Sequence, residues 1–183
     1  MPILAPETSL HPANLLDDGE AATDRRWWAV YTKSRQEKSL ARQLLSIDVP
    51  FYLPLVPKVS MIAGRKVKSE LPLFCSYLFL YATDEERVQT LATKRVAHMF
   101  DAPDARAIAR DLRNVRSLIA SGVPLTVEGR LSAGQRVRVK HGSLMGLEGV
   151  IVSRRGEDRL LVTVDFLQQG VSILISDFQV EPI

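Results

Sequence analysis

The residue types that most often carry enzyme chemistry are few in this 183-residue chain, and they lie far apart. Histidine occurs at His11, His98 and His141, and the single cysteine is Cys75. No histidine stands at a spacing typical of a metal site or a nucleophile–base pair, and the usual phosphate-loop and hydrolase motifs are missing. Cys75 lies in an apolar stretch, which predicts a buried, inert thiol. We therefore expect no enzyme activity, no catalytic residues, no metal and no cofactor.

Positive charge is concentrated in one part of the chain. The net charge is +3 overall, but it is −4 over residues 1–25, +6 over residues 26–100 and zero over residues 131–183. Such asymmetry indicates a surface that faces a polyanion. Charge alone leaves open the alternative that these residues form an ordinary solvated face.

The composition is that of a soluble globular protein, with 46% hydrophobic and 25% charged residues. No apolar run approaches the roughly 20 residues of a membrane span. The N-terminus lacks the basic and apolar regions of a secretory signal. These features and the lone cysteine predict a cytoplasmic protein that does not contact a membrane.

The first half of the chain predicts an α+β domain. Residues 27–32 and 73–81 have the aromatic and β-branched character of strands, and residues 51–55 and 96–100 predict two more. Ser34 and Glu37 form a capping-box pattern before a helix that ends near residue 46. Further helices are expected from Thr83 to about residue 92 and along the apolar face of Ile108, Leu112, Val115 and Ile119, which Gly122 ends. Between them, residues 59–71 predict a protruding basic hairpin around Gly64.

The last 50 residues predict only short strands. These strands are expected at 136–140, 149–152, 160–166, 171–175 and 178–180, with turn residues between them. Five short strands favour a small closed barrel, because an open sheet of that size could not cover its edges. The predicted organisation is therefore a mobile acidic arm (1–25), an α+β domain (26–122), a linker (123–131) and a β-barrel (132–183).

Four segments resemble the NusG family of transcription factors, and the first is residues 28–33, Trp-Ala-Val-Tyr-Thr-Lys, which precede a helix. Residues 73–79, Leu-Phe-Cys-Ser-Tyr-Leu-Phe, are similar to the F-P-G-Y segment of its NGN domain, with Cys75 and Ser76 in place of Pro-Gly. Residues 92–99 are similar to its N-T-x-G-V segment, with Arg95 in place of Gly. Residues 134–152, with Gly142 and Gly149, resemble the KOW motif, in which such glycines supply backbone conformations closed to other residues. The details are closer to specialised paralogues of the RfaH, UpxY and LoaP kind than to housekeeping NusG.

The resemblance implies an NGN domain with a mixed or antiparallel sheet flanked by helices, joined to an SH3-like KOW barrel. In the family the NGN domain binds the clamp helices of RNA polymerase through an aromatic patch. The matching positions are Phe74 and Tyr77, with Tyr31, Tyr52 and Phe79 as further candidates. The alternative for each of these side chains is a place in the core, because only alternate strand residues share a face.

The resemblance also implies a DNA-binding surface and a protein-binding barrel. The non-template DNA strand would contact Lys33, Arg35, Thr93 and Lys94, with added charge from Arg42. The KOW barrel would bind the ribosomal protein NusE or the factor Rho through Phe166, for which a core position is the alternative. The implied activity is that of a monomeric elongation and antitermination factor that holds the clamp closed and so reduces pausing and termination.

A second interpretation is a KOW-type RNA-binding or ribosome-associated protein. It would bind structured RNA through the basic hairpin residues Arg65, Lys66 and Lys68. A pull-down distinguishes the two interpretations, because polymerase as the main partner supports the first and ribosomal particles without polymerase support the second. The barrel itself is expected to be stable as a barrel, because its β-branched residues and glycines disfavour helix.

Overall fold

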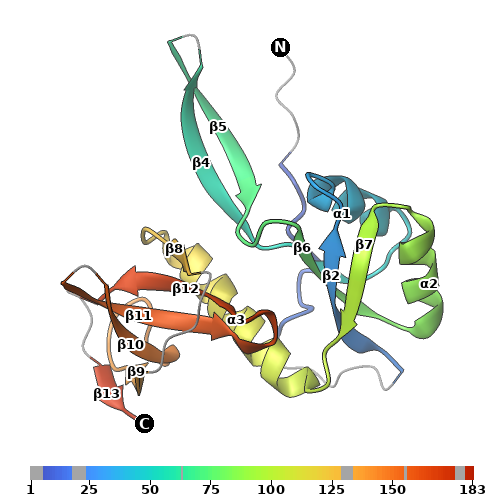
Figure 1. Cartoon of the computed structure of the whole chain (residues 1–183). Helices are drawn as coiled ribbons and strands as arrows, with labels where there is room; N and C mark the ends of the chain where they lie inside the picture. The colour runs from blue at the N-terminus through green and yellow to red at the C-terminus, as the bar shows by residue number, and fades with distance from the viewer. Residues whose placement is uncertain (1–5, 18–23, 63, 129–133, 155, 176–179) are drawn as a thin grey trace. The chain divides into compact units, whose positions relative to one another are not determined.

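The computed structural model describes residues 6–17, 24–62, 64–128, 134–154, 156–175 and 180–183. The chain divides into two compact units, Met1–Ala105 and Arg106–Ile183 (Figure 1). Within the described residues the fold is α+β, with three α-helices and antiparallel sheets. No described helix is both long and apolar enough to cross a membrane.

The first unit is built on a five-stranded antiparallel sheet in the order β1-β3-β6-β2-β7. Its strands, in the same order, are Leu10–His11, Phe51–Tyr52, Tyr77–Ala82, Arg26–Thr32 and Val96–Asp101. One face packs against α1 (Glu37–Ser46) around Val30, Leu40 and Leu78, which are all fully buried. This burial follows from the alternation along β2 and from the apolar spacing of α1.

The N-terminal segment departs from the predicted mobile arm. Leu10–His11 pairs with β3, and the Leu53 N–H donates to the Ser9 carbonyl at 2.7 Å. Leu16 is buried. Residues 6–17 are therefore part of the first unit, because apolar residues among them pair in its sheet or are buried in its core. Residues 1–5 and 18–23 lie outside the described residues.

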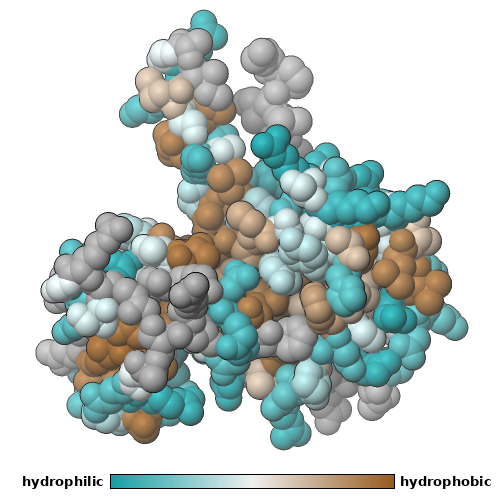
Figure 2. All heavy atoms as spheres, in the orientation of Figure 1, coloured by the Kyte–Doolittle hydropathy of each residue, from teal (hydrophilic) through white to brown (hydrophobic). Residues whose placement is uncertain are grey.

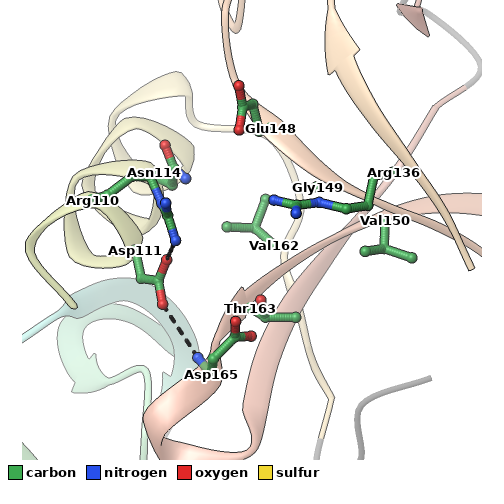
Figure 3. Close-up of a pocket in the computed structure, with 10 residues that line it drawn as sticks. All are labelled: Arg110, Asp111, Asn114, Arg136, Glu148, Gly149, Val150, Val162, Thr163 and Asp165. Carbon is green, nitrogen blue, oxygen red and sulfur yellow. Dashed lines mark hydrogen bonds and ion pairs between the residues drawn. The ribbon is translucent and has the colours of Figure 1, made fainter. Parts of the chain in front are cut away.

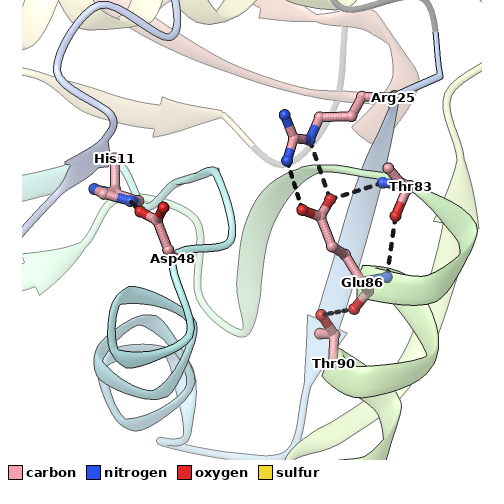
Figure 4. Close-up of polar contacts among 6 residues, drawn as sticks. All are labelled: His11, Arg25, Asp48, Thr83, Glu86 and Thr90. Atoms are coloured by element: carbon pink, nitrogen blue, oxygen red, sulfur yellow. Dashed lines mark hydrogen bonds and ion pairs between the residues drawn. The ribbon is translucent and has the colours of Figure 1, made fainter.

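Helix α2 (Asp84–Ala92) begins with a capping box. The Glu86 N–H donates to the Thr83 hydroxyl at 3.2 Å, and the Thr83 N–H donates back to the Glu86 carboxylate at 2.9 Å. Arg25 also donates to both oxygens of that carboxylate, at 2.6 and 3.1 Å (Figure 4). The hydrogen bond from Arg25 lowers the pKa of Glu86. This network joins the start of α2 to the residue preceding β2.

The capping box predicted at Ser34 is wrong. Helix α1 begins at Glu37, and its N-cap residue, Gln36, makes no side-chain cap hydrogen bond. The Glu37 carboxylate instead accepts the Ser76 N–H at 2.7 Å, across 39 residues of sequence. A contact with a distant segment therefore replaces the local pattern.

This contact holds the turn that precedes β6. Ser76 adopts a left-handed backbone with φ of 64°, which is costly for a residue with a Cβ. Its carbonyl accepts the Thr32 N–H at 2.8 Å, so both backbone polar groups of Ser76 are satisfied. The predicted strand over residues 73–81 is therefore shorter and begins at Tyr77. Cys75 lies in the same turn and is exposed, so the prediction of a buried thiol is wrong.

The second unit contains α3 (Ala105–Ser121, from Arg106 on) and a six-stranded antiparallel sheet in the order β13-β9-β10-β11-β12-β8. Its strands, in the same order, are Val180–Pro182, Gln135–Val139, Glu148–Arg154, Glu157–Val164, Gln169–Leu174 and Thr126–Glu128. Strand β8 falls in the predicted linker and pairs with β12. The two compact units divide after Ala105, whereas the sequence predicts the linker at residues 123–131.

Two glycines of the predicted KOW segment serve different purposes. Gly142 has a φ of 94°, as the sequence pattern predicts. Gly149 has no positive φ, but a Cβ there would lie 2.6 Å from the Leu161 carbonyl oxygen of the neighbouring strand. Gly149 thus allows β10 and β11 to approach closely, which a larger residue would prevent.

A buried carboxylate joins α3 to the sheet of the second unit. Asp111 accepts the Asp165 N–H at 3.3 Å and lies 3.5 Å from the Arg110 guanidinium (Figure 3). Burial is the main cause that raises the pKa of Asp111 to about 6, and the nearby Asp165 carboxylate raises it further. Burial therefore favours the protonated acid, although the hydrogen bond from the Asp165 N–H and the nearby Arg110 guanidinium favour the carboxylate.

We predict that Glu37→Ala lowers the free energy of unfolding by about 1–3 kcal/mol, because it leaves the Ser76 N–H without its acceptor. Glu37→Gln retains an acceptor oxygen and should lose clearly less in the same chemical denaturation experiment. Equal losses for the two variants would show that the hydrogen bond to Ser76 contributes little.

A second prediction concerns pH. The raised pKa of Asp111 means that its contribution to stability is complete below the unfolded-state pKa near 4 and is lost as pH rises through about 6. Asp111→Asn should therefore be more stable than the parent above pH 6, by about 2 kcal/mol, with the difference shrinking toward pH 4. Denaturant unfolding at a series of pH values measures it. A stability difference between the two proteins that does not change with pH would contradict the raised pKa of Asp111.

Candidate functional site

Three aromatic rings form a row across the sheet of the first unit. Strand β2 lies between β6 and β7, and Tyr31 is opposite Tyr77 on one side and His98 on the other. Residues paired in this way project from the same face of a sheet. Phe100, two residues after His98, belongs to that face as well.

These four residues, which we call the aromatic patch, remain accessible to solvent. Tyr31 is 41% exposed and Phe100 39% exposed, while Tyr77 is half-buried. The Tyr31 and Tyr77 ring centroids are 5.2 Å apart, and those of His98 and Phe100 are 4.4 Å apart. Burial, and then the neighbouring Tyr31, raises the pKa of Tyr77. Clustered rings of this kind offer apolar area at low entropic cost.

The structure places the other predicted aromatic residues in the core. Phe74, Phe79 and Tyr52 are all buried, and the Phe74 and Phe79 rings meet edge to face at 6.3 Å. They do not offer a ring to a partner in this conformation. This corrects the assignment of Phe74 to a surface patch: the turn ahead of Tyr77 directs the Phe74 ring inward.

Two turns carrying basic residues lie beside each other at the end of β2. The Lys33 N–H donates to the Arg95 carbonyl at 2.8 Å, which joins the β2–α1 turn to the α2–β7 turn. Lys33, Arg35 and Lys94 are exposed, and the last two have left-handed backbones with φ of 60° each. We call this pair of turns, with these three residues, the basic turns. The first of these turns begins at Lys33, two residues after Tyr31, so the basic turns adjoin the aromatic patch.

Arg95 fastens the basic turns to α1. Its guanidinium donates to Gln43 Oε1 at 3.1 Å and to Gln36 Oε1. The other two predicted DNA contacts are engaged elsewhere. The Thr93 hydroxyl donates to the Thr90 carbonyl at 2.7 Å, and Arg42 lies 3.4 Å from the Glu7 carboxylate. Lys33, Arg35 and Lys94 are therefore the three predicted contacts that the turns present together.

His98 and Phe100 are members of the patch that sequence reasoning missed. Residues 96–100 were predicted to be a strand, but the sequence does not indicate which strand it pairs with. Phe166, the predicted contact of the barrel, lies in a short 3₁₀ turn (Asp165–Leu167), and its side chain falls outside the described residues. Among the residues that the structure describes, no group of His, Cys, Asp and Glu side chains is arranged to hold a metal ion.

Comparison with known proteins gives the chain a family. The model of the family NusG, described as transcription termination factor nusG, matches residues 25–131. No curated protein matches the chain. The matched residues include β2, β6, β7 and the turns between them, so they contain both the aromatic patch and the basic turns. Since the match covers more than half of the 183 residues, the chain belongs to the NusG family of non-enzymatic transcription factors.

Proposed function

We propose that this protein is an elongation and antitermination factor whose aromatic patch binds the clamp helices of RNA polymerase. The observation that carries the proposal is the row of rings at Tyr31, Tyr77 and His98, which is continued by Phe100 and left open to solvent. Exposed aromatic clusters are frequent hot spots of protein interfaces. Holding the clamp closed would reduce pausing and termination without any bond chemistry.

The basic turns would contact the non-template DNA strand in the same complex. Lys33 and Lys94 offer charges for phosphates, and Arg35 offers a planar guanidinium that can also stack on an unpaired base. The turns adjoin the patch, so one docking event would bring polymerase and single-stranded DNA to the same end of the sheet. The role would be that of a specialised paralogue of the RfaH, UpxY or LoaP type, as the sequence resemblance implies.

The C-terminal strands would form an SH3-like KOW barrel that recruits NusE or Rho. Gly142 supports this part of the proposal through its positive φ, and Gly149 through the close approach of β10 and β11 that it allows. Phe166 is the proposed contact residue. The protein would act as a monomer in this scheme.

Loss of the two central rings tests the patch. We expect Tyr31→Ala/Tyr77→Ala to weaken binding to core RNA polymerase by at least about tenfold, because the anchors of an interface supply most of its energy. Leu45→Ala/Leu91→Ala removes comparable exposed side chains from the helices and should bind as the parent does. Biolayer interferometry with immobilised polymerase measures both variants.

Transcription in vitro through a pause site and a terminator provides the functional control for these variants. The parent and the helix variant should increase read-through, while the tyrosine variant should not. Full polymerase affinity in the tyrosine variant, or no effect of the parent at saturation, would refute the proposal.

The basic turns give a separate prediction about single-stranded DNA. Lys33→Gln/Lys94→Gln should weaken binding of a labelled single strand and lower the slope of log affinity against log salt by about 1.4, since each phosphate contact contributes about 0.7. Fluorescence anisotropy at several salt concentrations measures the slope. Arg106→Gln/Lys140→Gln, which removes the same charge from the second unit, should leave the slope unchanged. An equal decrease of the slope in both variants would show that the effect comes from net charge and not from the basic turns.

A further inference from the structure

The hairpin of β4 (Leu55–Ile62) and β5 (Arg65–Pro72) is an unpartnered two-stranded ribbon. Its two strands pair with each other, from Leu55 opposite Pro72 to Ile62 opposite Arg65. The hairpin projects from the rest of the first unit (Figure 1). Beyond its first residues most of its described side chains are exposed, which accords with the predicted protruding hairpin. Neither the aromatic patch nor the basic turns include any of its residues.

The charge of the ribbon is strongly one-sided. Residues 55–72 contain four basic residues and one acid, Glu70. The four basic residues, Lys58, Arg65, Lys66 and Lys68, are all exposed, and no described ion pair engages them. The ribbon therefore presents a positive surface to solvent along most of its length.

The register shows how these charges are distributed. Directly opposed residues share a face, so Val59 with Lys68 and Met61 with Lys66 form one face. This face combines an apolar row on β4 with a lysine row on β5, and Val59 and Met61 are 58% and 63% exposed. Lys58 points to the opposite face, so positive charge flanks the ribbon on both sides. Figure 2 shows brown apolar and teal hydrophilic side chains together on the projecting ribbon.

We propose that this ribbon is a second nucleic-acid site that docks in the major groove of duplex DNA. A two-stranded ribbon fits the B-form major groove, whereas the A-form groove of duplex RNA is too narrow. Groove walls carry phosphates, and Lys66 and Lys68, on the β5 side of the face that carries Val59 and Met61, would lie beside one of them. The exposed row of Val59 and Met61 would face the groove floor, where thymine methyl groups offer apolar contact. The site goes beyond the single-strand contact proposed above, since its ligand is double-stranded.

The test uses the full chain and a labelled mixed-sequence DNA duplex, read by fluorescence anisotropy. Lys66→Gln/Lys68→Gln should weaken binding on the order of tenfold in about 50 mM salt and lower the salt slope by about 2. Glu70→Lys adds a charge to the same face and should bind more tightly than the parent. Arg106→Gln/Lys140→Gln is the matched control and should bind as the parent does. The hairpin lies outside the core, so the thermal midpoints should agree.

Several outcomes would overturn the site. One is an equal loss of duplex affinity in the control variant. Another is that duplex RNA of the same sequence binds with the same affinity as the DNA and loses as much affinity in the lysine variant. A third is that the lysine variant differs from the parent in oligomeric state, measured by light scattering, and not in DNA affinity. The ribbon would then be a self-association surface. Polymerase binding without DNA is measured in parallel. A lysine variant that keeps polymerase affinity but loses duplex binding separates this site from the aromatic patch.

Discussion

The pairing of β2 with strands on both sides is the constraint on which the candidate site depends. Because β2 runs antiparallel to β6 and β7, residues distant in sequence come into one row, and Tyr31 meets Tyr77 and His98. The same pairing brings the turns after β2 and before β7 together, where the Lys33 N–H reaches the Arg95 carbonyl. A slip of one residue would turn the tyrosines to the other face and separate the aromatic and basic surfaces.

Backbone strain is concentrated at the ends of these strands. Ser76, Arg35 and Lys94 all have left-handed backbones although each has a Cβ. Contacts with other segments hold the turns: Glu37 and Thr32 bind Ser76, and Arg95 fastens the basic turns to α1. Such residues persist only where the surroundings hold them, and they are enriched at functional sites. Helix α1 therefore supports both the turn before Tyr77 and the basic turns.

Local patterns in the sequence predicted much of the fold. The helices α2 and α3, the strands β2 and β7 and the basic hairpin follow from periodicity and turn residues. The errors arose where distant contacts override local preference. Glu37 binds Ser76 and not Ser34. The segment before Tyr77 forms a turn and not a strand, and Leu10–His11 joins the sheet. For the site, alternation shows which strand residues share a face, but only pairing shows that Tyr31, Tyr77, His98 and Phe100 share one patch.

The central claim is that the aromatic patch, and no other face of the first unit, meets RNA polymerase. Photo-crosslinking tests it most directly, with a photoreactive phenylalanine analogue at Phe100 on the patch or at Leu45 on α1, both of which are exposed. Each full-length protein is irradiated with core polymerase, and the crosslinked peptides are identified by mass spectrometry. We expect efficient crosslinks from position 100 to the clamp helices and few from position 45. Equal crosslinking from both positions, or crosslinks from position 100 that avoid the clamp, would contradict it.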